Sequence, residues 1–258
     1  MTYQTILFEK EERVATISFN RPQAMNALDL VMMEELGQVF EELHKDKEIQ
    51  IVILKGEGRA FSSGGDIKGM LTGGLDIEKA MVLVSNYIRS LYTLPMITIA
   101  QVHGAAAGLG LSTALACDFV IAEETSKIAM NFIGIGLVPD GGGHFFMQER
   151  LGAVKAKQAI WKGEVMPGTK AQKIGLVDEL VAEGLLDEEV EKFKQALLNS
   201  PIAAMIATKE IINGSKINEL NDALKQETKT QPMMRKTTDH LEGIQAFVEK
   251  RQPKFTGK

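Results

Sequence analysis

Residues 97–118 place a strand, a turn of small residues and an apolar helix in direct succession, and this order constrains the fold more than any other stretch. Residues 97–102 form a short apolar run with β-branched side chains, which predicts a buried strand. The sequence HGAAAGLG follows, and residues 111–117, nearly free of polar side chains, predict a buried helix. The first N–H groups of a helix lack intrahelical partners and carry partial positive charge. This turn therefore suits an oxyanion or a phosphate.

A second glycine-rich stretch, RAFSSGGDIKGM at residues 59–70, follows an apolar run at residues 51–54 that predicts another buried strand. It again places small residues and glycines before an apolar, helix-compatible segment. Either stretch alone is typical of a tight turn. The two together, each after a strand, favour a ligand site that uses backbone from both.

The segments AFSSGGDIK and HGAAAGLG resemble the two signature segments of the crotonase superfamily, the enoyl-CoA hydratase/isomerase family. Supporting motifs are NRPQAMNAL at residues 20–28, GLVPDGGG at 136–143 and KRQPKF near the C-terminus. The resemblance covers essentially the whole chain in the right order. It implies acyl-CoA thioester substrates, an oxyanion hole that stabilises an enolate, and no separate cofactor, because coenzyme A is part of the substrate. It does not specify the reaction.

The composition fits a soluble globular protein: 258 residues, 45% of them hydrophobic and 24% charged. A net charge of −5 argues against a general nucleic-acid binder. The single cysteine, Cys117, excludes an intramolecular disulfide and fits a reducing compartment. No secretory signal and no apolar run of roughly 18 residues is present. We therefore expect a cytoplasmic protein with no nucleic-acid or membrane partner, and no metal-ligand spacing occurs.

The order of predicted elements is α/β alternation followed by helices alone from about Pro201. The resemblance implies a ββα spiral core over residues 1–200, with the CoA site and the oxyanion hole, and a helical region over residues 201–258 that covers the site and builds a trimer, often stacked as a hexamer. The predicted strands are residues 6–8, 14–19, 51–54, 97–102, 119–122 and 128–132, with a short strand near 175–178. The predicted helices are residues 28–43, with Asn26 and Asp29 at its start, and 77–91, 111–117, 145–151, 153–161, 169–174, 186–199, 202–213, 217–230 and 234–250.

The resemblance places the two oxyanion-hole donors on the backbone N–H groups of Gly65 and Leu109. Family members usually have glycine at the second position. Any residue except proline keeps the N–H, so the hole can persist with leucine. We expect Leu109 to narrow the pocket or to require a less permissive backbone angle.

Hydration in the resembling family uses two glutamates that hold and activate water. One follows the second N–H donor by three residues, where this chain has Ser112. The other precedes the proline of the G-x-x-P turn by seven residues, where this chain has Phe132. Neither side chain can act as a base near neutral pH. The sequence therefore argues against water addition.

Asp140, in the turn VPDGGG, occupies a position where several resembling enzymes place a catalytic aspartate. In enoyl-CoA and phenylacetate-pathway isomerases it moves protons, and in an aryl-CoA dehalogenase it is a nucleophile. The alternative is a helix N-cap, which Asp before glycines and a helix also predicts. A single carboxylate suits removal of a proton from one carbon and its return to another, so we favour isomerisation. His144, one helical turn later, could pair with Asp140 or face solvent.

For coenzyme A, the resemblance implies contacts through mostly main-chain groups of the first glycine-rich segment, with Ala24 near the thioester end of the pantetheine arm. The cations Arg21 and Lys68 are candidates for the phosphates. The implied contacts in the first segment are Ala60, Ser62, Gly64, Asp66 and Ile67.

Three hypotheses remain from the sequence. The first is an enoyl-CoA double-bond isomerase with Asp140 as proton shuttle. The second is an enoyl-CoA hydratase, a lyase, with atypical acid and base residues. The third is a family member that binds acyl-CoA without turnover. The acyl chain, the choice between trimer and hexamer and the metabolic role are not determined by the residues alone.

Overall fold

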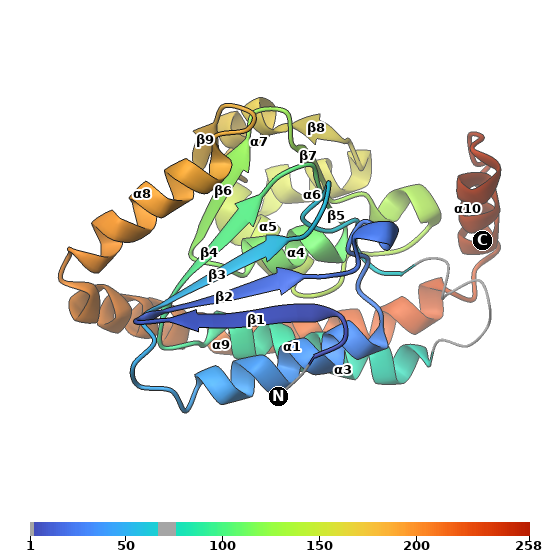
Figure 1. Ribbon diagram of the computed structural model, residues 1–258. Coiled ribbons are helices and arrows are strands. Elements are labelled where there is room, and N and C mark those ends of the chain that lie inside the picture. The colour runs from blue at the N-terminus through green and yellow to red at the C-terminus, as the bar shows by residue number, and fades with distance from the viewer. Residues whose placement is uncertain (1–2, 67–75) are drawn as a thin grey trace.

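The computed structural model describes residues 3–66 and 76–258, which form two sheets surrounded by helices (Figure 1). The larger sheet has the strand order β1-β2-β3-β4-β6-β9, and the smaller has the order β5-β7-β8. The strands are β1 (Ile6–Glu11), β2 (Val14–Phe19), β3 (Ile51–Gly56), β4 (Ile97–Val102), β5 (Ala105–Ala107), β6 (Phe119–Glu123), β7 (Lys127–Ala129), β8 (Met166–Pro167) and β9 (Glu179–Val181).

Helices alternate with the strands and then follow alone to the C-terminus. This order confirms the α/β class with a C-terminal helical region. The α-helices are α1 (Leu30–Leu43), α3 (Ile77–Tyr92), α4 (Leu109–Leu115), α5 (Gly143–Leu151), α6 (Ala153–Lys162), α7 (Gly168–Ile174), α8 (Leu186–Leu198), α9 (Ile202–Met234) and α10 (Thr238–Glu249); the short 3-10 helices are η1 (Pro22–Ala24) and η2 (Phe132–Ile135).

The larger sheet is covered on both faces. Side chains along its strands therefore alternate between two separate hydrophobic cores. In β3, Val52 and Leu54 belong to the main core, whereas Ile51 and Ile53 belong to a second core beneath α8. This period of two is what a pleated strand imposes. β1 and β2 form an antiparallel hairpin, and the other strands of the sheet pair in parallel. Parallel strands buried on both faces explain the continuous apolar run of β4.

The chain passes from one sheet to the other between β4 and β5, at His103 and Gly104. Gly104 has φ +57°, and a Cβ there would lie 2.1 Å from the carbonyl oxygen of Arg59. Only glycine permits both that conformation and that approach. β5 then leads directly into α4, so the chain has the order strand, short strand, helix at this point. This crossing brings the two glycine-rich stretches together.

The C-terminal region differs from the sequence expectation at one point. α9 is one continuous helix of 33 residues, not two helices with a break near residues 214–216. Nothing surrounds Gly214, so the position is open, and glycine costs only about 1 kcal/mol in a helix interior. Burial of Leu220 and Leu224 against the main core offsets that cost. Figure 1 shows α9 running beneath the sheet alongside α1 and α3.

Three boundaries also differ. The predicted strand at 128–132 ends at Ala129 in β7, and Phe132 begins η2 instead. The strand expected near 175–178 begins later, at Glu179. The final helix starts at Thr238, not at 234, because the side chain of Thr237 accepts a hydrogen bond from the backbone N–H of His240 and caps it.

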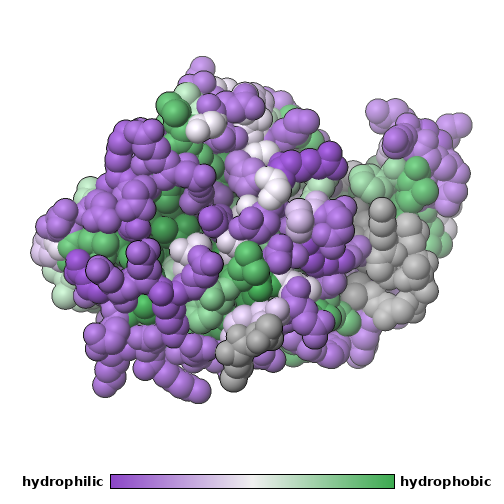
Figure 2. All heavy atoms as spheres, in the orientation of Figure 1, coloured by the Kyte–Doolittle hydropathy of each residue, from purple (hydrophilic) through white to green (hydrophobic). Residues whose placement is uncertain are grey.

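The face of the molecule drawn in Figure 2 is mostly hydrophilic, with smaller hydrophobic areas between the charged side chains. Within residues 3–66 and 76–258, no helix combines the length and apolar character needed to cross a bilayer.

Candidate active site

The two glycine-rich stretches lie side by side and are hydrogen-bonded to one another. The N–H of Phe61 donates to the carbonyl of His103 at 2.9 Å, and the N–H of Ser62 donates to Ala105 at 2.9 Å. The N–H of Ala107 donates back to the carbonyl of Ser62 at 3.0 Å. The backbone of each stretch is therefore fixed by the other.

Two glycines, Gly64 and Gly108, allow the backbones of the two stretches to approach each other closely beyond these hydrogen bonds. Gly64 has φ +97°, and a Cβ there would lie 2.7 Å from the carbonyl oxygen of Ala107 and 3.5 Å from the backbone nitrogen of Leu109. Gly108 has φ +52° and precedes the first residue of α4. The left-handed angle thus falls on Gly108, so the expectation that Leu109 itself would need an unfavourable backbone angle is wrong. Leucine is tolerated at the first helical position without strain.

The N–H groups of Gly65 and Leu109 donate no hydrogen bond to any residue that the structure describes. Both residues line one pocket of about 190 Å³, and Asp140 lines it too. Two backbone donors and one carboxyl group therefore share a single concave site. The described lining residues are Ser63, Gly64, Gly65, Gly108, Leu109, Asn131, Phe132, Gly134, Ile135, Leu137, Asp140 and Phe247.

Asp140 does not cap a helix, which removes the alternative that its sequence context had left open. The residue that precedes α5 is Gly142, with φ +75° and no side-chain cap. The Oδ2 atom of Asp140 accepts a hydrogen bond from Nε2 of Gln231 at 3.0 Å. Its Oδ1 atom is buried and has no hydrogen-bond partner among the described residues.

Burial raises the pKa of Asp140 to about 7. The hydrogen bond from Gln231 opposes this rise, the negative charge of Glu227 adds to it, and the charges of His144 and Arg235 oppose it. Desolvation penalises a carboxylate more than its neutral acid, which is why the burial effect dominates. A carboxyl group with a pKa near the working pH can both accept and donate a proton.

The two positions where the family has glutamates contribute no carboxylate. Ser112 is fully buried, and its hydroxyl donates to the backbone carbonyl of Asp140 at 2.7 Å. Phe132 is also buried and lines the pocket. A Cβ on Gly108 would lie 3.6 Å from the ring of Phe132. Ser112 thus supports the turn that carries Asp140, and Phe132 presents an apolar ring to the pocket.

Sequence reasoning missed two residues of α9, Glu227 and Gln231. Glu227 is only 2% exposed and accepts hydrogen bonds from the backbone N–H groups of Gly142 at 2.7 Å and His144 at 3.2 Å. His144 pairs through Nδ1 with Glu227 at 2.8 Å, not with Asp140. Glu227 and Gln231 are four residues apart, which places them on the same face of α9. This spacing was the one sequence signal that the two side chains act together. Only the fold shows that they face the turn of Asp140.

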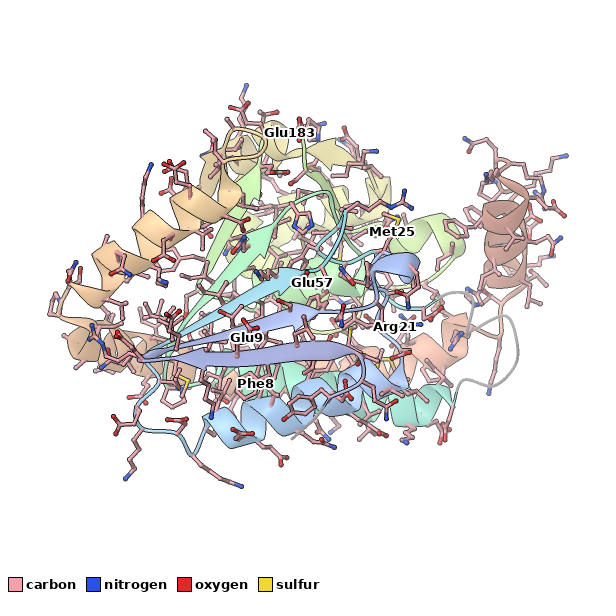
Figure 3. All side chains as sticks on the ribbon, viewed as in Figure 1. Phe8, Glu9, Arg21, Met25, Glu57 and Glu183 are labelled. Atoms are coloured by element: carbon pink, nitrogen blue, oxygen red, sulfur yellow. The ribbon has the colours of Figure 1, made fainter. Side chains whose placement is uncertain are left out.

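The loop at residues 20–29 is held against the segment that follows β3. Asn26 does not start a helix; its Nδ2 donates to the carbonyls of Glu57 and Ala60, at 2.9 and 2.7 Å. Asp29 alone caps α1, by accepting from the N–H of Met32. Figure 3 labels Arg21, Met25 and Glu57, which lie together where β2 and β3 end.

Among the residues implied for coenzyme A, Ala60 and Ser62 are fully buried, and the hydroxyl of Ser62 donates to the carbonyl of Asn26 at 2.7 Å. Arg21 pairs with Asp66 at 2.9 Å and with Asp29 at 3.3 Å, so its guanidinium already joins two carboxylates. Ala24 ends η1 and is partly exposed. Ile67 and Lys68 lie outside the described residues.

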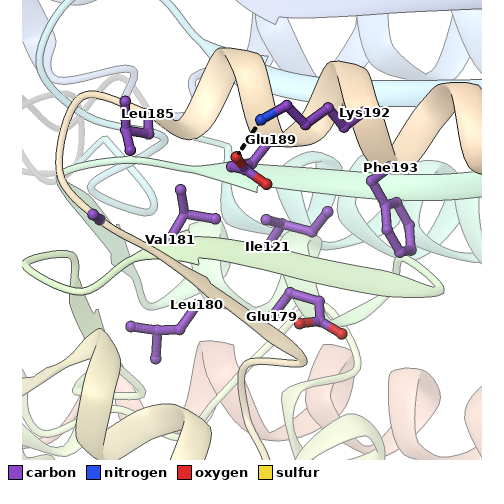
Figure 4. Close-up of a pocket in the computed structure, with 9 residues that line it drawn as sticks. Ile121, Glu179, Leu180, Val181, Leu185, Glu189, Lys192 and Phe193 are labelled. Atoms are coloured by element: carbon purple, nitrogen blue, oxygen red, sulfur yellow. Dashed lines mark hydrogen bonds and ion pairs between the residues drawn. The ribbon is translucent and has the colours of Figure 1, made fainter.

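A larger pocket, of about 490 Å³, lies between β6, β9 and α8 on the other face of the sheet (Figure 4). Its charged groups include Glu189 and Lys192, which are exposed and paired with each other at 2.9 Å. None of the described titratable side chains that line it is buried. The described part of the chain also contains no cluster of His, Cys, Asp or Glu suited to a metal ion. The chemistry therefore concentrates in the pocket of Asp140.

Comparison with known proteins shows the family of this chain. A family model described as enoyl-CoA hydratase/isomerase matches residues 9–258. The chain belongs to the enoyl-CoA hydratase/isomerase family. It is 46% identical, over 94% of this chain and 95% of the other, to YhaR of Bacillus subtilis strain 168, whose name places it among the enoyl-CoA hydratase/isomerases.

Two further members of the enoyl-CoA hydratase/isomerase family differ in their named reactions. A 1,2-epoxyphenylacetyl-CoA isomerase of Escherichia coli K12 is 30% identical, with 98% of each chain covered. A solved enoyl-CoA hydratase from Mycobacterium avium subsp. paratuberculosis K-10 superposes with a TM-score of 0.90 at 32% identity, covering 99% of this chain and all of the other. The crotonase fold expected from the sequence is confirmed. The family acts on acyl-CoA thioesters, and its names include both isomerisation and hydration.

Proposed function

We propose that this protein is an enoyl-CoA isomerase that moves a double bond through an enolate, with Asp140 as the proton shuttle. The observation that carries the proposal is one pocket whose described lining has a single carboxyl group, Asp140. The same lining includes Gly65 and Leu109, whose backbone N–H groups have no partner among the described residues. The relative of Escherichia coli named as a 1,2-epoxyphenylacetyl-CoA isomerase supports isomerisation of an acyl-CoA, although its named substrate is an epoxide.

In the proposed reaction, a 3-enoyl thioester binds with its carbonyl oxygen against the N–H groups of Gly65 and Leu109. The carboxylate of Asp140 takes a proton from C2, and the electron pair of that C–H bond forms a dienolate whose negative charge rests on the thioester oxygen. The protonated Asp140 then donates its proton to C4, and the double bond moves to C2–C3. Atoms and charge balance without any cofactor.

The oxyanion donors supply the largest part of the proposed catalysis. Preorganised backbone donors act where charge develops, and loss of one costs roughly 3–4 kcal/mol in comparable sites. Leu109 is the first residue of α4, so its N–H also benefits from the positive end of the helix dipole. Gly65 contributes from the neighbouring stretch, which the hydrogen bonds around Ser62 hold in place.

The first glycine-rich stretch is also the proposed binding site for coenzyme A. We propose that the backbone of residues 60–68, together with Ala24, binds the adenine and pantetheine parts, as the family resemblance implies. The side chains of Ala60 and Ser62 are buried, so they offer no side-chain group to the ligand. Because Arg21 is paired with Asp29 and Asp66, we assign it to the support of the loop.

The test is to supply a 3-enoyl-CoA and follow formation of the conjugated 2-enoyl-CoA by its absorbance. We expect turnover by the wild type and its loss in Asp140→Asn. The absence of turnover, or undiminished turnover in that variant, would exclude the mechanism. Formation of 3-hydroxyacyl-CoA from 2-enoyl-CoA would instead support a hydratase, as the name of the mycobacterial structure suggests. Calorimetric binding of acyl-CoA without any turnover would indicate a non-catalytic member.

We also propose that the chain assembles as a trimer or a dimer of trimers in the cytoplasm. Large apolar side chains are exposed on the isolated chain, among them Trp161, Val154 and Ile211, each at least 64% exposed. Such surface marks protein–protein contacts when it is contiguous. Light scattering of the purified protein gives the mass of the assembly, and a monomer would contradict this proposal.

A further inference from the structure

We propose that Gln231 is a positioning residue that holds Oδ2 of Asp140 and leaves Oδ1 as the oxygen that carries the migrating proton. The inference rests on the proposed isomerase function and deepens it, because it assigns the proton transfer to one atom. Gln231 lies in the last turns of α9, ninety-one residues from Asp140 along the chain, and is only 2% exposed.

The orientation of the Gln231 amide is fixed by a neighbour that can only accept. Its Nε2 atom lies 3.0 Å from the backbone carbonyl of Val138 and 3.0 Å from Oδ2 of Asp140. A carbonyl oxygen has no proton to donate, so the NH₂ group, not the amide oxygen, must face Val138. The same NH₂ group therefore also faces Asp140. Asp140 receives a hydrogen bond that an inverted amide could not give.

This bond survives both protonation states of Asp140. In the carboxylate, Oδ2 accepts from Gln231 and Oδ1 has no partner among the described residues. When Asp140 takes a proton on Oδ1, Oδ2 remains a carbonyl oxygen that still accepts the same hydrogen bond. A proton on Oδ2 would instead meet the NH₂ group of Gln231. The proton can therefore arrive and leave at Oδ1 without any rearrangement of α9.

The charged and titratable groups around Asp140 come from several elements. Glu227 lies on α9 and His144 on α5, and they pair with each other at 2.8 Å. Arg235 follows α9 and Tyr87 lies on α3, and both interact with Asp140 electrostatically. Gln231 is the only one of these neighbours that the described structure shows in a direct side-chain hydrogen bond to the carboxyl group. The hydrogen bond from Gln231 therefore makes Oδ2 of Asp140 differ from Oδ1.

The experiment compares Gln231→Met, Gln231→Glu and the control Gln226→Met, which changes an exposed glutamine on the same helix. The pH profile of kcat/KM for a 3-enoyl-CoA is measured for each variant. Methionine has similar size but donates no hydrogen bond, so the carboxylate loses its stabilising donor. We expect the rising limb of the profile to move upward by about one pH unit, with kcat at pH 7 reduced about fivefold and KM within about twofold. Gln226→Met leaves the profile unchanged.

Gln231→Glu places a second carboxyl group beside the first and should move the limb further upward, because two carboxylates in one site repel. It also keeps the test decisive if Gln231→Met does not fold, which circular dichroism would reveal. A loss of activity by the same factor at every pH would mean that Gln231 is merely structural. An unchanged profile in both variants would overturn the inference as well.

An infrared titration separates this inference from the proposed function. The C=O stretch of protonated Asp140 is the band that disappears in Asp140→Asn, and its titration needs no turnover. If the wild type fails to isomerise any substrate but Gln231→Met shifts this titration upward, the function is wrong and the positioning role stands. If the wild type is active and the titration does not move in Gln231→Met, the positioning role is wrong and the function stands.

Discussion

The backbone N–H of Gly142 donates a 2.7 Å hydrogen bond to Oε2 of Glu227, a carboxylate that lies 85 residues further along the chain. Glu227 also accepts from the backbone and the side chain of His144. α9 therefore holds the start of α5, and with it the turn that carries Asp140, through one buried side chain.

We expect Glu227→Leu to lower the free energy of unfolding by about 3 kcal/mol, because a buried backbone donor and its neighbours lose their acceptor. Urea denaturation measures the change. The matched control is Glu219→Leu, since Glu219 is exposed on the same helix and pairs only with Lys216 in the described structure. Equal effects of the two substitutions would show that the contacts of Glu227 contribute little.

Asp140→Asn should remove isomerase activity and yet stabilise the protein at alkaline pH. The pKa of Asp140 is raised from 3.8 to about 7 in the folded chain. Between these values the folded state binds more protons than the unfolded state, so this carboxyl group lowers stability as the pH rises from 4 to 7. The full cost, up to about 4 kcal/mol above pH 7, is absent from the asparagine variant. At pH 4 the two proteins should differ by less than about 1 kcal/mol.

Thermal or urea unfolding at pH 4, 6 and 8 checks this prediction. A stability difference that does not grow with pH would mean that Asp140 is not the buried acid described. The carboxyl group of Asp140 lowers stability and is also the group proposed to move protons. The comparison of the wild type with Asp140→Asn therefore measures a stability–activity trade-off at one residue.

Leu109→Pro tests the second oxyanion donor without disturbing its helix. Leu109 is the first residue of α4, a position where proline is tolerated because the N–H has no intrahelical partner. The substitution removes that N–H together with the leucine side chain, so Leu109→Ala, which keeps the N–H, is the control. We expect kcat/KM of the proline variant to fall about 10²- to 10³-fold below that of the alanine variant. Similar rates in the two variants would show that this N–H is not a donor to the substrate.

Gly141→Ala should distort the turn that carries Asp140. Gly141 has φ +63°, and a Cβ there would lie 2.5 Å from Cδ1 of Leu109. We expect a loss of roughly 1–3 kcal/mol from overpacking, in addition to about 1 kcal/mol for the left-handed angle. Gly184→Ala is the control for the angle alone, since Gly184 has φ +82° and nothing within 4 Å. The double variant Gly141→Ala with Leu109→Ala should show a coupling energy that reports the removed clash. Strictly additive losses would mean that the two residues do not contact.

Most of the fold followed from local sequence. The apolar runs at β3 and β4, the glycine-rich stretches after them and the change to helices near Pro201 each have a local physical cause, and the structure has these elements in that order. The errors occurred where local rules compete with packing. Separate helices were expected at residues 202–213 and 217–230, but burial of Leu220 and Leu224 outweighed the small cost of Gly214 in a continuous helix.

The sequence by itself determined the family, the two glycine-rich segments and the absence of glutamates at Ser112 and Phe132, because these depend on residue identity and spacing. Only the tertiary structure decided that Asp140 is not a helix cap, that the left-handed angle belongs to Gly108, and that Gln231 and Glu227 support the turn of Asp140. The physical reason is that a hydrogen bond or a pKa depends on which atoms lie within a few ångströms. Residues 91 positions apart reach that distance only when the chain is folded.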